Sequence, residues 1–297
     1  MAIQNISVIG LGSMGTPVAT FLLKAGYRLR GFDILKRRMS DLVPFGLKPA
    51  SSARAAATGA ELIILSLPNW NAVKEVVEGK EGILPILKRG QILVDASTVP
   101  PWETVAMAKR LAKRGVDWMN LPVSGSAAEA REGNLVFMAG GKRSVFKKIK
   151  PVFDQIGRKI IYVGDHGKAA MLKLIVNHIL FINQAAAAEG LTVGLKAGID
   201  PDILLDAVTS GAANSNLIAA RGRDMVRGDF SGKGALEIAV KDIGIIVENG
   251  RRLGVTIPMA ALYQQLLLSA YHRGWNQKDA TIVMKIFEEL SGIKRKP

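Results

Sequence analysis

The chain has 297 residues, no cysteine, 48% hydrophobic residues and a formal net charge of +15. This length can bury a sizeable core and corresponds to one large or two ordinary domains, and we work with two. The lack of cysteine excludes disulfides, thiolate metal sites and cysteine nucleophiles, and it fits a thermostable protein. Because no charged segment followed by an apolar core opens the chain, we expect a cytoplasmic protein.

The positive charge is concentrated in the first half of the chain, with +12 on residues 1–164 and +3 on residues 165–297. Such a charge invites a nucleic-acid or membrane interpretation. However, many basic residues occur in pairs such as Lys109-Arg110 and Lys147-Lys148, at spacings typical of solvated helix faces. Without interleaved aromatics or a nucleic-acid motif, we expect a basic surface and neither specific nucleic-acid binding nor membrane binding.

The first half of the chain alternates apolar runs with helical patterns, which predicts an α/β fold with a doubly wound parallel sheet of the Rossmann type. We assign residues 1–164 to this dinucleotide-binding domain. The predicted strands are Ile6–Ile9, Arg28–Phe32, Leu62–Ser66, Ile92–Asp95, Asp117–Leu121, Leu135–Ala139 and Ile160–Val163.

From residue 165 onward the patterns are helical throughout, which predicts an all-α domain over residues 165–297. A long interdomain helix is expected from Lys168 to about Lys196. Six polar residues interrupt it too often for a membrane span: Lys173, Asn177, His178, Asn183, Gln184 and Glu189. The further predicted helices are Pro201–Ser210 with Asp200 as cap, Asn214–Arg227, Leu236–Leu253 ended by Gly254, Pro258–Gly274 and Asp279–Ser291.

An apolar run leads directly into three glycines at dinucleotide-binding spacing, Gly10, Gly12 and Gly15. Gly10 would permit the tight turn, Gly12 would leave room for a pyrophosphate, and Gly15 would let the next helix pack closely. Asp33 follows the second strand at the place of a ribose-binding acid. The alternative is a glycine-rich turn that binds nothing. The further predicted cofactor-binding residues are Leu11, Ser13, Met14, Leu67, Pro68 and Thr98.

The choice between NAD and NADP stays open at this level. Asp33 would accept hydrogen bonds from the ribose hydroxyls of NAD and repel a 2′-phosphate. The three cations Lys36, Arg37 and Arg38 would offset that repulsion and permit NADP. Their alternative role is an exposed start to the next helix.

Two hydroxyl-rich stretches follow predicted strands, where ligands bind in open α/β sheets. Asp95-Ala96-Ser97-Thr98 is one, and a capped helix start is its alternative role. The other contains Ser124, Gly125 and Ser126, whose hydroxyls and backbone N–H groups would cradle a carboxylate. An ordinary turn is the alternative for this second stretch.

Lys173 and Asn177 lie four residues apart and therefore share one face of the long helix, in an otherwise apolar stretch. Burial would disfavour the lysine ammonium, and an oxidised nicotinamide would disfavour it further, which would prepare a general base. The alternative is a lysine that reaches solvent beside an asparagine that caps another group.

In order, these motifs resemble the β-hydroxyacid dehydrogenase family, which includes 3-hydroxyisobutyrate dehydrogenase, tartronate semialdehyde reductase and a class of serine dehydrogenases. The resemblance spans nearly the whole chain. It rests on Gly-Leu-Gly-Ser-Met-Gly at 10–15, Asp-Ala-Ser-Thr at 95–98, Pro-Val-Ser-Gly at 122–125, the Gly, Lys and Asn spacing from 164 to 177, and Lys-Asp at 241–242.

The resemblance implies a role for each matching residue. Ser124 and Gly125 would hold the substrate carboxylate, Lys173 would be the general acid/base, Asn177 would orient the substrate, and Lys241 would lie beside cofactor and substrate. It also implies a helical domain that forms a homodimer or homotetramer. Phe230 is retained from the family pattern and counts among the substrate-binding residues.

Three departures bear on the substrate. Ser126 stands where a second glycine is usual, Asn120-Leu121 replaces the usual Asp-Ala, and Gly234 stands where members often carry Phe. A missing ring would widen the substrate pocket. Val176 replaces the His of 6-phosphogluconate dehydrogenases, which argues against sugar-phosphate decarboxylation.

The sequence therefore predicts an oxidoreductase that transfers hydride between a short 3-hydroxy acid and NAD or NADP, without a metal. The substrate class is serine, 3-hydroxyisobutyrate or 3-hydroxypropionate. Imine or short-chain semialdehyde reduction on the same scaffold is one alternative, although relatives that reduce imines usually lack the helix lysine. A non-catalytic nucleotide-binding module with nucleic-acid affinity is the other.

Overall fold

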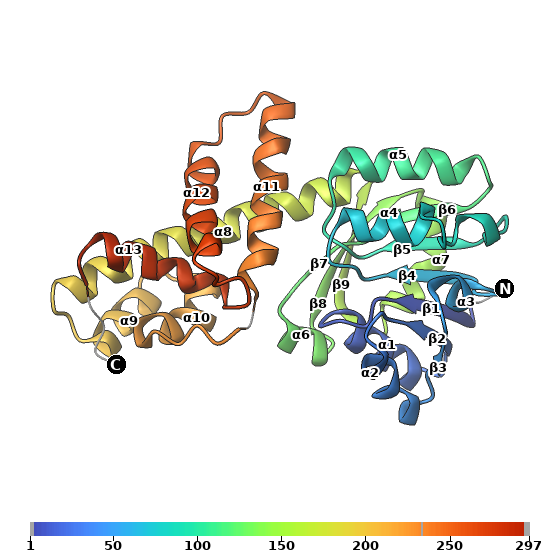
Figure 1. Ribbon diagram of the computed structural model, residues 1–297, viewed down its shortest axis with the longest axis horizontal. Coiled ribbons are helices and arrows are strands. Elements are labelled where there is room, and N and C mark those ends of the chain that lie inside the picture. Colours follow the sequence, from blue (N-terminus) through green and yellow to red (C-terminus); the bar gives the residue numbers. More distant parts are fainter. Residues whose placement is uncertain (1–2, 233, 294–297) are drawn as a thin grey trace. The chain divides into compact units, whose positions relative to one another are not determined.

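The computed structural model describes residues 3–232 and 234–293. Residues 1–2 and 294–297, at the outer ends of the two predicted domains, lie outside the described residues, as does residue 233. The chain divides into two compact units, Met1–Lys173 and Leu174–Pro297. Each unit is described by itself (Figure 1).

The first unit is built on one sheet, to which nine strands of the described residues contribute, in the order β3-β2-β1-β4-β5-β6-β8-β7, with β9 beside β8. The six strands from β3 to β6 are parallel and have the strand order of a dinucleotide-binding fold. The strands are β1 Asn5–Ile9, β2 Arg28–Phe32, β3 Lys48–Pro49, β4 Leu62–Leu65, β5 Ile92–Asp95, β6 Asp117–Asn120, β7 Val123–Ser124, β8 Leu135–Gly141 and β9 Gly157–Gly164.

Helices cover both faces of this sheet, which is why its central strands read as continuous apolar runs. All four residues of β4 and of β5 are buried. The core on one face includes side chains of α1 and α7, and the core on the other includes those of α3, α4 and α5 (Figure 1). The helices of this unit are α1 Gly15–Lys24, α2 Lys36–Ser40, η1 Val43–Phe45, α3 Ala53–Ala57, α4 Trp70–Glu78, η2 Leu84–Ile86, α5 Pro101–Ala112, α6 Ala127–Arg131 and α7 Arg143–Phe153.

Every strand predicted from the sequence is present, and two that were not predicted are added. β3 and β7 have two residues each and no apolar run, so hydrophobic periodicity gives no signal for them. β7 pairs antiparallel with β8, with Ser124 opposite Val136. Ser124 therefore lies on a short strand rather than in the turn that the sequence suggested.

Helix α8, Lys168–Lys196, begins in the first unit. Ala169 is completely buried, and a Cβ placed on Gly140 of β8 would lie only 2.9 Å from the Ala169 Cβ. Gly167 lies against Pro101 at the start of α5. Because its first turns pack on the sheet, the compact unit extends to Lys173, beyond residue 164; the functional boundary between 164 and 165 stays a prediction.

The second unit is helical, and its core is formed by the rest of α8 together with the later helices. These are α9 Pro201–Ser210, α10 Asn216–Arg227, α11 Leu236–Leu253, α12 Pro258–His272, η3 Ala280–Val283 and α13 Met284–Leu290. Asp200 caps α9 through two backbone N–H groups, and Gly254 ends α11 in a left-handed conformation, as predicted.

Three helix boundaries differ from the prediction. α10 begins at Asn216 because the Ser215 hydroxyl caps it by accepting from the Ile218 N–H at 3.3 Å. α12 ends at His272. The predicted helix Asp279–Ser291 is η3 followed by α13, since Asp279 accepts from the Thr281 N–H and holds a tight turn there.

Helix α8 is long and apolar enough to cross a membrane by length and composition alone, with a mean hydropathy of 1.3. Core helices of globular proteins pass the same test. Leu174, Phe181, Ala188 and Leu191 of α8 belong to the core of the second unit, and the polar Asn177 is buried too. This packing favours a core helix.

Candidate functional site

The glycine loop between β1 and α1 has the geometry of a phosphate cradle. A Cβ on Gly10, whose φ is +92°, would lie 2.2 Å from the Ser66 carbonyl oxygen, and one on Gly15 would lie 1.9 Å from the Gly10 oxygen. At Gly12 a Cβ meets only the Arg38 guanidinium, at 3.9 Å. Two glycines are therefore required by packing, and the third keeps open the place where a pyrophosphate approaches in this fold.

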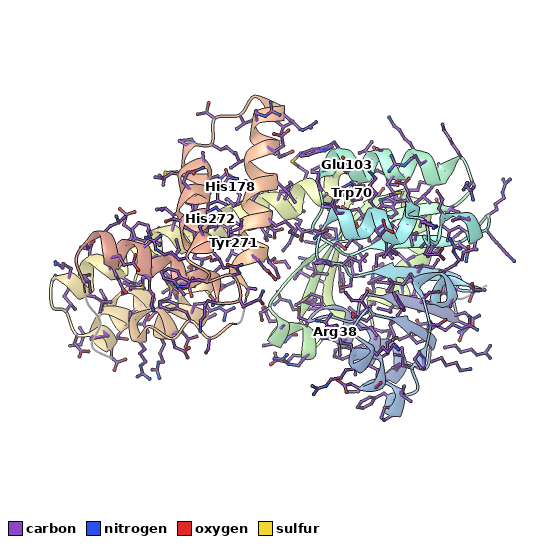
Figure 2. All side chains as sticks on the ribbon, in the orientation of Figure 1. Arg38, Trp70, Glu103, His178, Tyr271 and His272 are labelled. Carbon is purple, nitrogen blue, oxygen red and sulfur yellow. The ribbon has the colours of Figure 1, made fainter. Side chains whose placement is uncertain are left out.

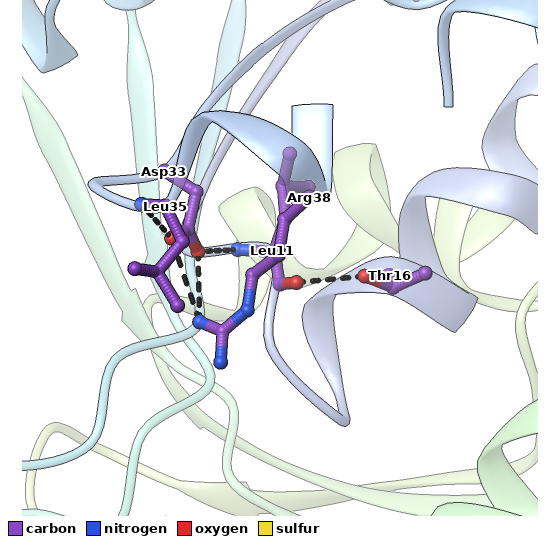
Figure 3. Close-up of polar contacts among 5 residues, drawn as sticks. All are labelled: Leu11, Thr16, Asp33, Leu35 and Arg38. Carbon is purple, nitrogen blue, oxygen red and sulfur yellow. Dashed lines mark hydrogen bonds and ion pairs between the residues drawn. The ribbon is translucent and has the colours of Figure 1, made fainter. Parts of the chain in front are cut away.

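Asp33, directly after β2, is held rigidly at the predicted ribose position (Figure 3). Its side chain is 4% exposed. One carboxylate oxygen accepts the Leu11 N–H at 2.7 Å, and the other accepts the Leu35 N–H at 2.8 Å. The acid thus joins the second strand to the glycine loop, and the Thr16 hydroxyl braces the same loop by donating to the Leu11 carbonyl at 2.7 Å.

Of the three predicted cations, Arg38 is the one that contacts Asp33. Its Nη1 lies 3.4 Å from Oδ1 and 3.2 Å from Oδ2, and the side chain is 45% exposed. Lys36 and Arg37 are exposed, and Arg37 pairs with Asp41 at 3.9 Å. Arg38 therefore partly neutralises the ribose-binding acid from one side.

The stretch after β5 is tied to the stretch after β4 at the carboxyl edge of the sheet. The hydroxyl of the buried Ser97 accepts the Leu67 N–H at 3.0 Å, and the Ser97 N–H donates to Asp95 at 2.9 Å. Thr98 is half-buried and Pro68 exposed at this edge. The predicted cofactor-binding residues of three loops thus gather at one edge, as the sheet order requires.

Ser126 of the predicted carboxylate cradle is the N-cap of α6. Its hydroxyl accepts the Glu129 N–H at 3.2 Å, and its own N–H donates to the Glu129 carboxylate at 2.7 Å. That second bond is the main cause lowering the pKa of Glu129 below its usual value, so the glutamate is ionised near neutral pH. The hydroxyl and the N–H of Ser126 are therefore engaged with Glu129, and the contact of Ser126 with a substrate carboxylate stays a prediction.

Asn120, at the end of β6, is completely buried. Its Nδ2 donates to the Asp95 carbonyl at 3.4 Å. This departure from the family pattern therefore joins two strands beneath the carboxyl edge.

Lys173 lies in the second turn of α8 and is half-buried, and its role as general acid/base stays a prediction. Leu174 beside it is 2% exposed, but Ile175 is 47% exposed. The surroundings are therefore apolar on one side of the helix only.

Asn177, one turn after Lys173, is 5% exposed and is fixed by a residue that sequence reasoning did not assign to the site. Its Nδ2 donates to Oδ2 of Asp242 on α11 at 2.8 Å. Lys241 Nζ lies 3.0 Å from the other oxygen of the same carboxylate, in an ion pair. The position of Asp242 directly after Lys241, in the Lys-Asp motif, was the sequence feature from which its place in the site could have been inferred.

Phe230 and Gly234 precede α11. Phe230 is 5% exposed within the core of the second unit, so it offers little surface to a substrate, and its substrate contact stays a prediction. A Cβ on Gly234 would meet only Asp279, at 3.8 Å. A larger side chain is therefore sterically admissible at residue 234.

His178 lies on α8 and His272 on α12 (Figure 2). His272 makes an edge-to-face contact with Tyr271, with ring centroids 5.8 Å apart. Within residues 3–232 and 234–293, no three His, Asp or Glu side chains gather in a way that could hold a metal ion.

Two family models together match most of the chain. Residues 5–164 match the NAD-binding domain of 6-phosphogluconate dehydrogenase, and residues 167–287 match the NAD-binding family of NADP-dependent 3-hydroxyisobutyrate dehydrogenase.

Individual relatives match over almost their full length. The chain is 34% identical to 2-(hydroxymethyl)glutarate dehydrogenase of Eubacterium barkeri, covering 97% of this chain and 96% of that one. It is 29% identical to the NAD-dependent L-serine dehydrogenase of Pseudomonas aeruginosa, with 97% and 99% covered. The crystal structure of 3-hydroxyisobutyrate dehydrogenase from Salmonella typhimurium superimposes with a TM-score of 0.88 at 29% identity, covering 95% and 99%.

Together, the glycine cradle, the acid after β2, the Lys173 and Asn177 spacing and these matches show that the chain belongs to the β-hydroxyacid dehydrogenase family of nicotinamide-dependent oxidoreductases.

Proposed function

We propose that this chain reversibly oxidises the hydroxyl group of a short 3-hydroxy acid, with Lys173 as general acid/base. The observation that carries the proposal is the fixed position of Asn177. Its side chain is buried one helical turn after Lys173, and its Nδ2 donates to Asp242 Oδ2 at 2.8 Å. One Nδ2 proton is engaged, so a second proton and the amide oxygen stay in a fixed orientation for a substrate. Precise positioning of this kind is what an alcohol oxidation needs.

The nicotinamide cofactor supplies the hydride acceptor or donor. In oxidation, Lys173 would accept the hydroxyl proton as the carbinol carbon becomes a carbonyl carbon, and the cofactor, when bound, would supply the acceptor for the hydride. In reduction, the Lys173 ammonium returns that proton to the oxygen. Such proton transfer by a positioned side chain contributes about 10²–10⁴-fold to the rate.

Ser124 and the Gly125 backbone serve the substrate carboxylate in this proposal, and Ser126 caps α6. Since Glu129 is ionised beside Ser126, the carboxylate is held on the β7 side of the cradle. Thr98 and Lys241 complete the predicted contacts to cofactor and substrate.

For the cofactor we infer NAD. The Asp33 carboxylate is held by two backbone N–H groups, so it cannot turn away from a 2′-phosphate. Arg38 reduces this discrimination against NADP because its Nη1 contacts both carboxylate oxygens.

Titration of protein fluorescence with each dinucleotide tests the inference that NAD is the cofactor. NAD should bind more tightly, Asp33→Asn should reduce the preference about tenfold, and Arg38→Gln should weaken NADP more than NAD. Tighter binding of NADP by the natural chain would refute it.

For the substrate we infer a site that admits substituents at the carbon next to the carboxylate. Gly234 has no side chain where family members often carry Phe, and a Cβ there would meet only Asp279, at 3.8 Å, so the first atom of a side chain fits at this position. Gly234→Phe should therefore fold normally and lose activity on branched acids more than on 3-hydroxypropionate. Equal losses on all acids would contradict the inference.

The experiment that tests the function is an absorbance assay at about 340 nm, where the reduced nicotinamide absorbs. Purified protein is mixed with NAD or NADP and with L-serine, D-serine, 3-hydroxyisobutyrate or 3-hydroxypropionate. We expect reduction of the cofactor with at least one acid and its loss in Lys173→Ala. No reduction in any combination, despite demonstrated cofactor binding, would overturn the proposal.

We also infer that the chain assembles into a homodimer or homotetramer. Apolar side chains are exposed along α8 and α12: Ile175 at 47%, Ile179 at 59%, Val193 at 65%, Met259 at 56% and Leu262 at 60%. We take these exposed apolar side chains as part of an interaction surface. Light scattering coupled to size exclusion should give a mass of two or four chains, and a monomer at micromolar concentration would contradict the inference.

A further inference from the structure

In the second unit, the stretch that leads into α11 is tied to a distant stretch of chain. We name residues 230–232 and 234–236 the entry segment and residues 276–280 the clamp segment. Backbone hydrogen bonds join them, from Asp279 N–H to the Phe230 carbonyl at 3.0 Å, from Ala280 N–H to Gly234 at 2.9 Å, and from Leu236 N–H to Lys278 at 2.8 Å. Ala235 and Asp279 form an isolated antiparallel bridge. The start of α11 is therefore set by the clamp segment.

The Asp279 side chain adds a buried charged contact to this backbone pairing. It is 8% exposed. Oδ2 accepts the Gly234 N–H at 2.9 Å and lies 3.5 Å from Nη2 of Arg221, whose side chain is 16% exposed. Oδ1 accepts the N–H and the hydroxyl of Thr281 at 3.0 and 2.7 Å. These contacts engage both oxygens of the Asp279 carboxylate, each of which can accept more than one hydrogen bond.

A neutral amide cannot replace this carboxylate without loss. Asparagine of the same shape would direct two N–H donors at groups that are themselves donors. A buried donor without an acceptor costs the full desolvation of that group. The ionised acid, rather than its volume, is what holds Gly234 in place.

The entry segment connects this clamp to the residues of the proposed site. It carries Gly234, where we infer the space for the substrate substituent, and it leads into the helix that presents Lys241 and Asp242. Because Asp242 holds Asn177 at 2.8 Å, a shift at the start of α11 would alter that contact.

We propose that Asp279 is a positioning residue of the dehydrogenase: its carboxylate holds the entry segment and thereby sets the position of Asp242 and the shape of the substrate site. The inference rests on the proposed function for its effect on the substrate. Its effect on the entry segment does not depend on activity.

The test compares Asp279→Asn with Thr281→Val in the full-length protein. Both remove hydrogen bonds from the same buried carboxylate, but Thr281→Val keeps the bond to the Gly234 N–H. Three quantities are measured: amide hydrogen exchange of a peptide that covers the entry segment, KM and kcat for the best hydroxy acid, and Kd for the cofactor. In Asp279→Asn we expect the hydrogen exchange of the entry segment to become about tenfold faster and KM for the hydroxy acid to rise about tenfold. Each change corresponds to the loss of one hydrogen bond to a charged group. The Kd for the cofactor should stay unchanged. Thr281→Val should lower Tm without either effect.

Equal exchange and equal KM in the two variants would overturn the proposal, because both would then act only through stability. A cofactor Kd that weakens as much as KM rises would do so too. If Asp279→Asn does not fold, Arg221→Gln, which removes one partner and keeps the acid, should give the same changes at smaller size. If the natural chain oxidises none of the hydroxy acids, the proposed function fails, and the hydrogen exchange still decides the role of Asp279.

Discussion

The two units present their functional groups in different ways. In the sheet unit, the cofactor loop is made of backbone, and glycines are present because a Cβ would overlap a carbonyl oxygen, as at Gly10 and Gly15. In the helical unit the arrangement consists of side chains, Asn177 and Asp242, which lie 65 residues apart in the chain.

This difference determines which changes each unit tolerates. A backbone loop is indifferent to most neighbouring side chains but is disturbed by a single added methyl group. When one partner of a buried side-chain pair is replaced by a residue of similar shape, the protein still folds, but the remaining partner loses its fixed orientation. The following predictions would sharpen or break this comparison.

The largest effect is expected for Lys173→Ala. Removal of the proposed general acid/base should lower kcat by about 10²–10⁴-fold, because proton transfer then depends on water. The cofactor Kd should stay within about twofold, since the dinucleotide cradle is untouched. Steady-state kinetics and fluorescence titration measure both quantities.

Lys168→Ala is the matched control for this change, since Lys168 is an exposed lysine on the same helix. It should retain full turnover. If Lys173→Ala kept its activity, the base would have to be another residue.

The glycine loop offers a pair of variants that separate folding from binding. Gly15→Ala overlaps the Gly10 oxygen and should cost about 1–3 kcal/mol of unfolding free energy or more, as overpacking does. Gly12→Ala meets no backbone atom and should change stability by less than about 0.5 kcal/mol. Both should weaken cofactor binding. Urea unfolding and cofactor titration distinguish them, and tight cofactor binding by Gly12→Ala would mean that the pyrophosphate lies elsewhere.

A smaller effect is expected for Asp242→Asn, which keeps the shape but removes the charge shared by Asn177 and Lys241. We expect kcat/KM to fall about 10- to 100-fold, the loss of a hydrogen bond to a charged group, and Tm to fall by a few degrees, which leaves the protein folded at the assay temperature. Glu237→Gln, an exposed change on the same helix, is the control. A drop in Tm that accounts for the lost activity would make Asp242 a purely structural residue.

The smallest effect concerns the pH dependence of stability and His166, before α8. Burial, with the positive charge of Lys142 adding to it, lowers the pKa of His166 below its usual value, against the opposing charges of Asp165 and Asp117. The folded chain therefore keeps His166 neutral at a pH where the unfolded chain binds a proton. This contribution is present in full above the unfolded pKa of about 6.5 and is lost as the pH falls from there towards the lower folded value.

His166→Gln should accordingly flatten the decline of the unfolding free energy between about pH 7 and pH 5. His272→Gln, an exposed histidine of the helical unit, is the control. Calorimetry at several pH values measures the difference, and an unchanged slope in His166→Gln would contradict the role of burial.

Much of the sheet unit follows from local pattern. Local pattern predicts seven of the strands. The signal is clearest for β4 and β5, whose residues are all buried, because strands covered on both faces need apolar residues. β3 and β7 could not be predicted from such a pattern, because they have two residues each and are strands only through their pairing with β2 and β8. Ser126 shows a second reason why sequence reasoning falls short. A serine followed three residues later by a glutamate is typical of a helix cap, and a serine beside a glycine is also typical of a carboxylate-binding loop, so the sequence does not distinguish the two roles.

The sequence by itself determined the glycine loop at which we expect a dinucleotide, since the need for glycine at residues 10 and 15 is a steric property of the backbone. It also determined that Lys173 and Asn177 share a helix face, because that spacing is intrinsic to a helix. Only the tertiary structure decided that Asp242 holds Asn177, that Arg38 rather than Lys36 or Arg37 contacts Asp33, and that Asp279 clamps the segment before α11. Asp242 and Asp279 lie far along the chain from the groups they hold, and Lys36, Arg37 and Arg38 are adjacent cations that the sequence does not distinguish. Only the packing of the folded chain brings one particular donor within reach of one particular acceptor.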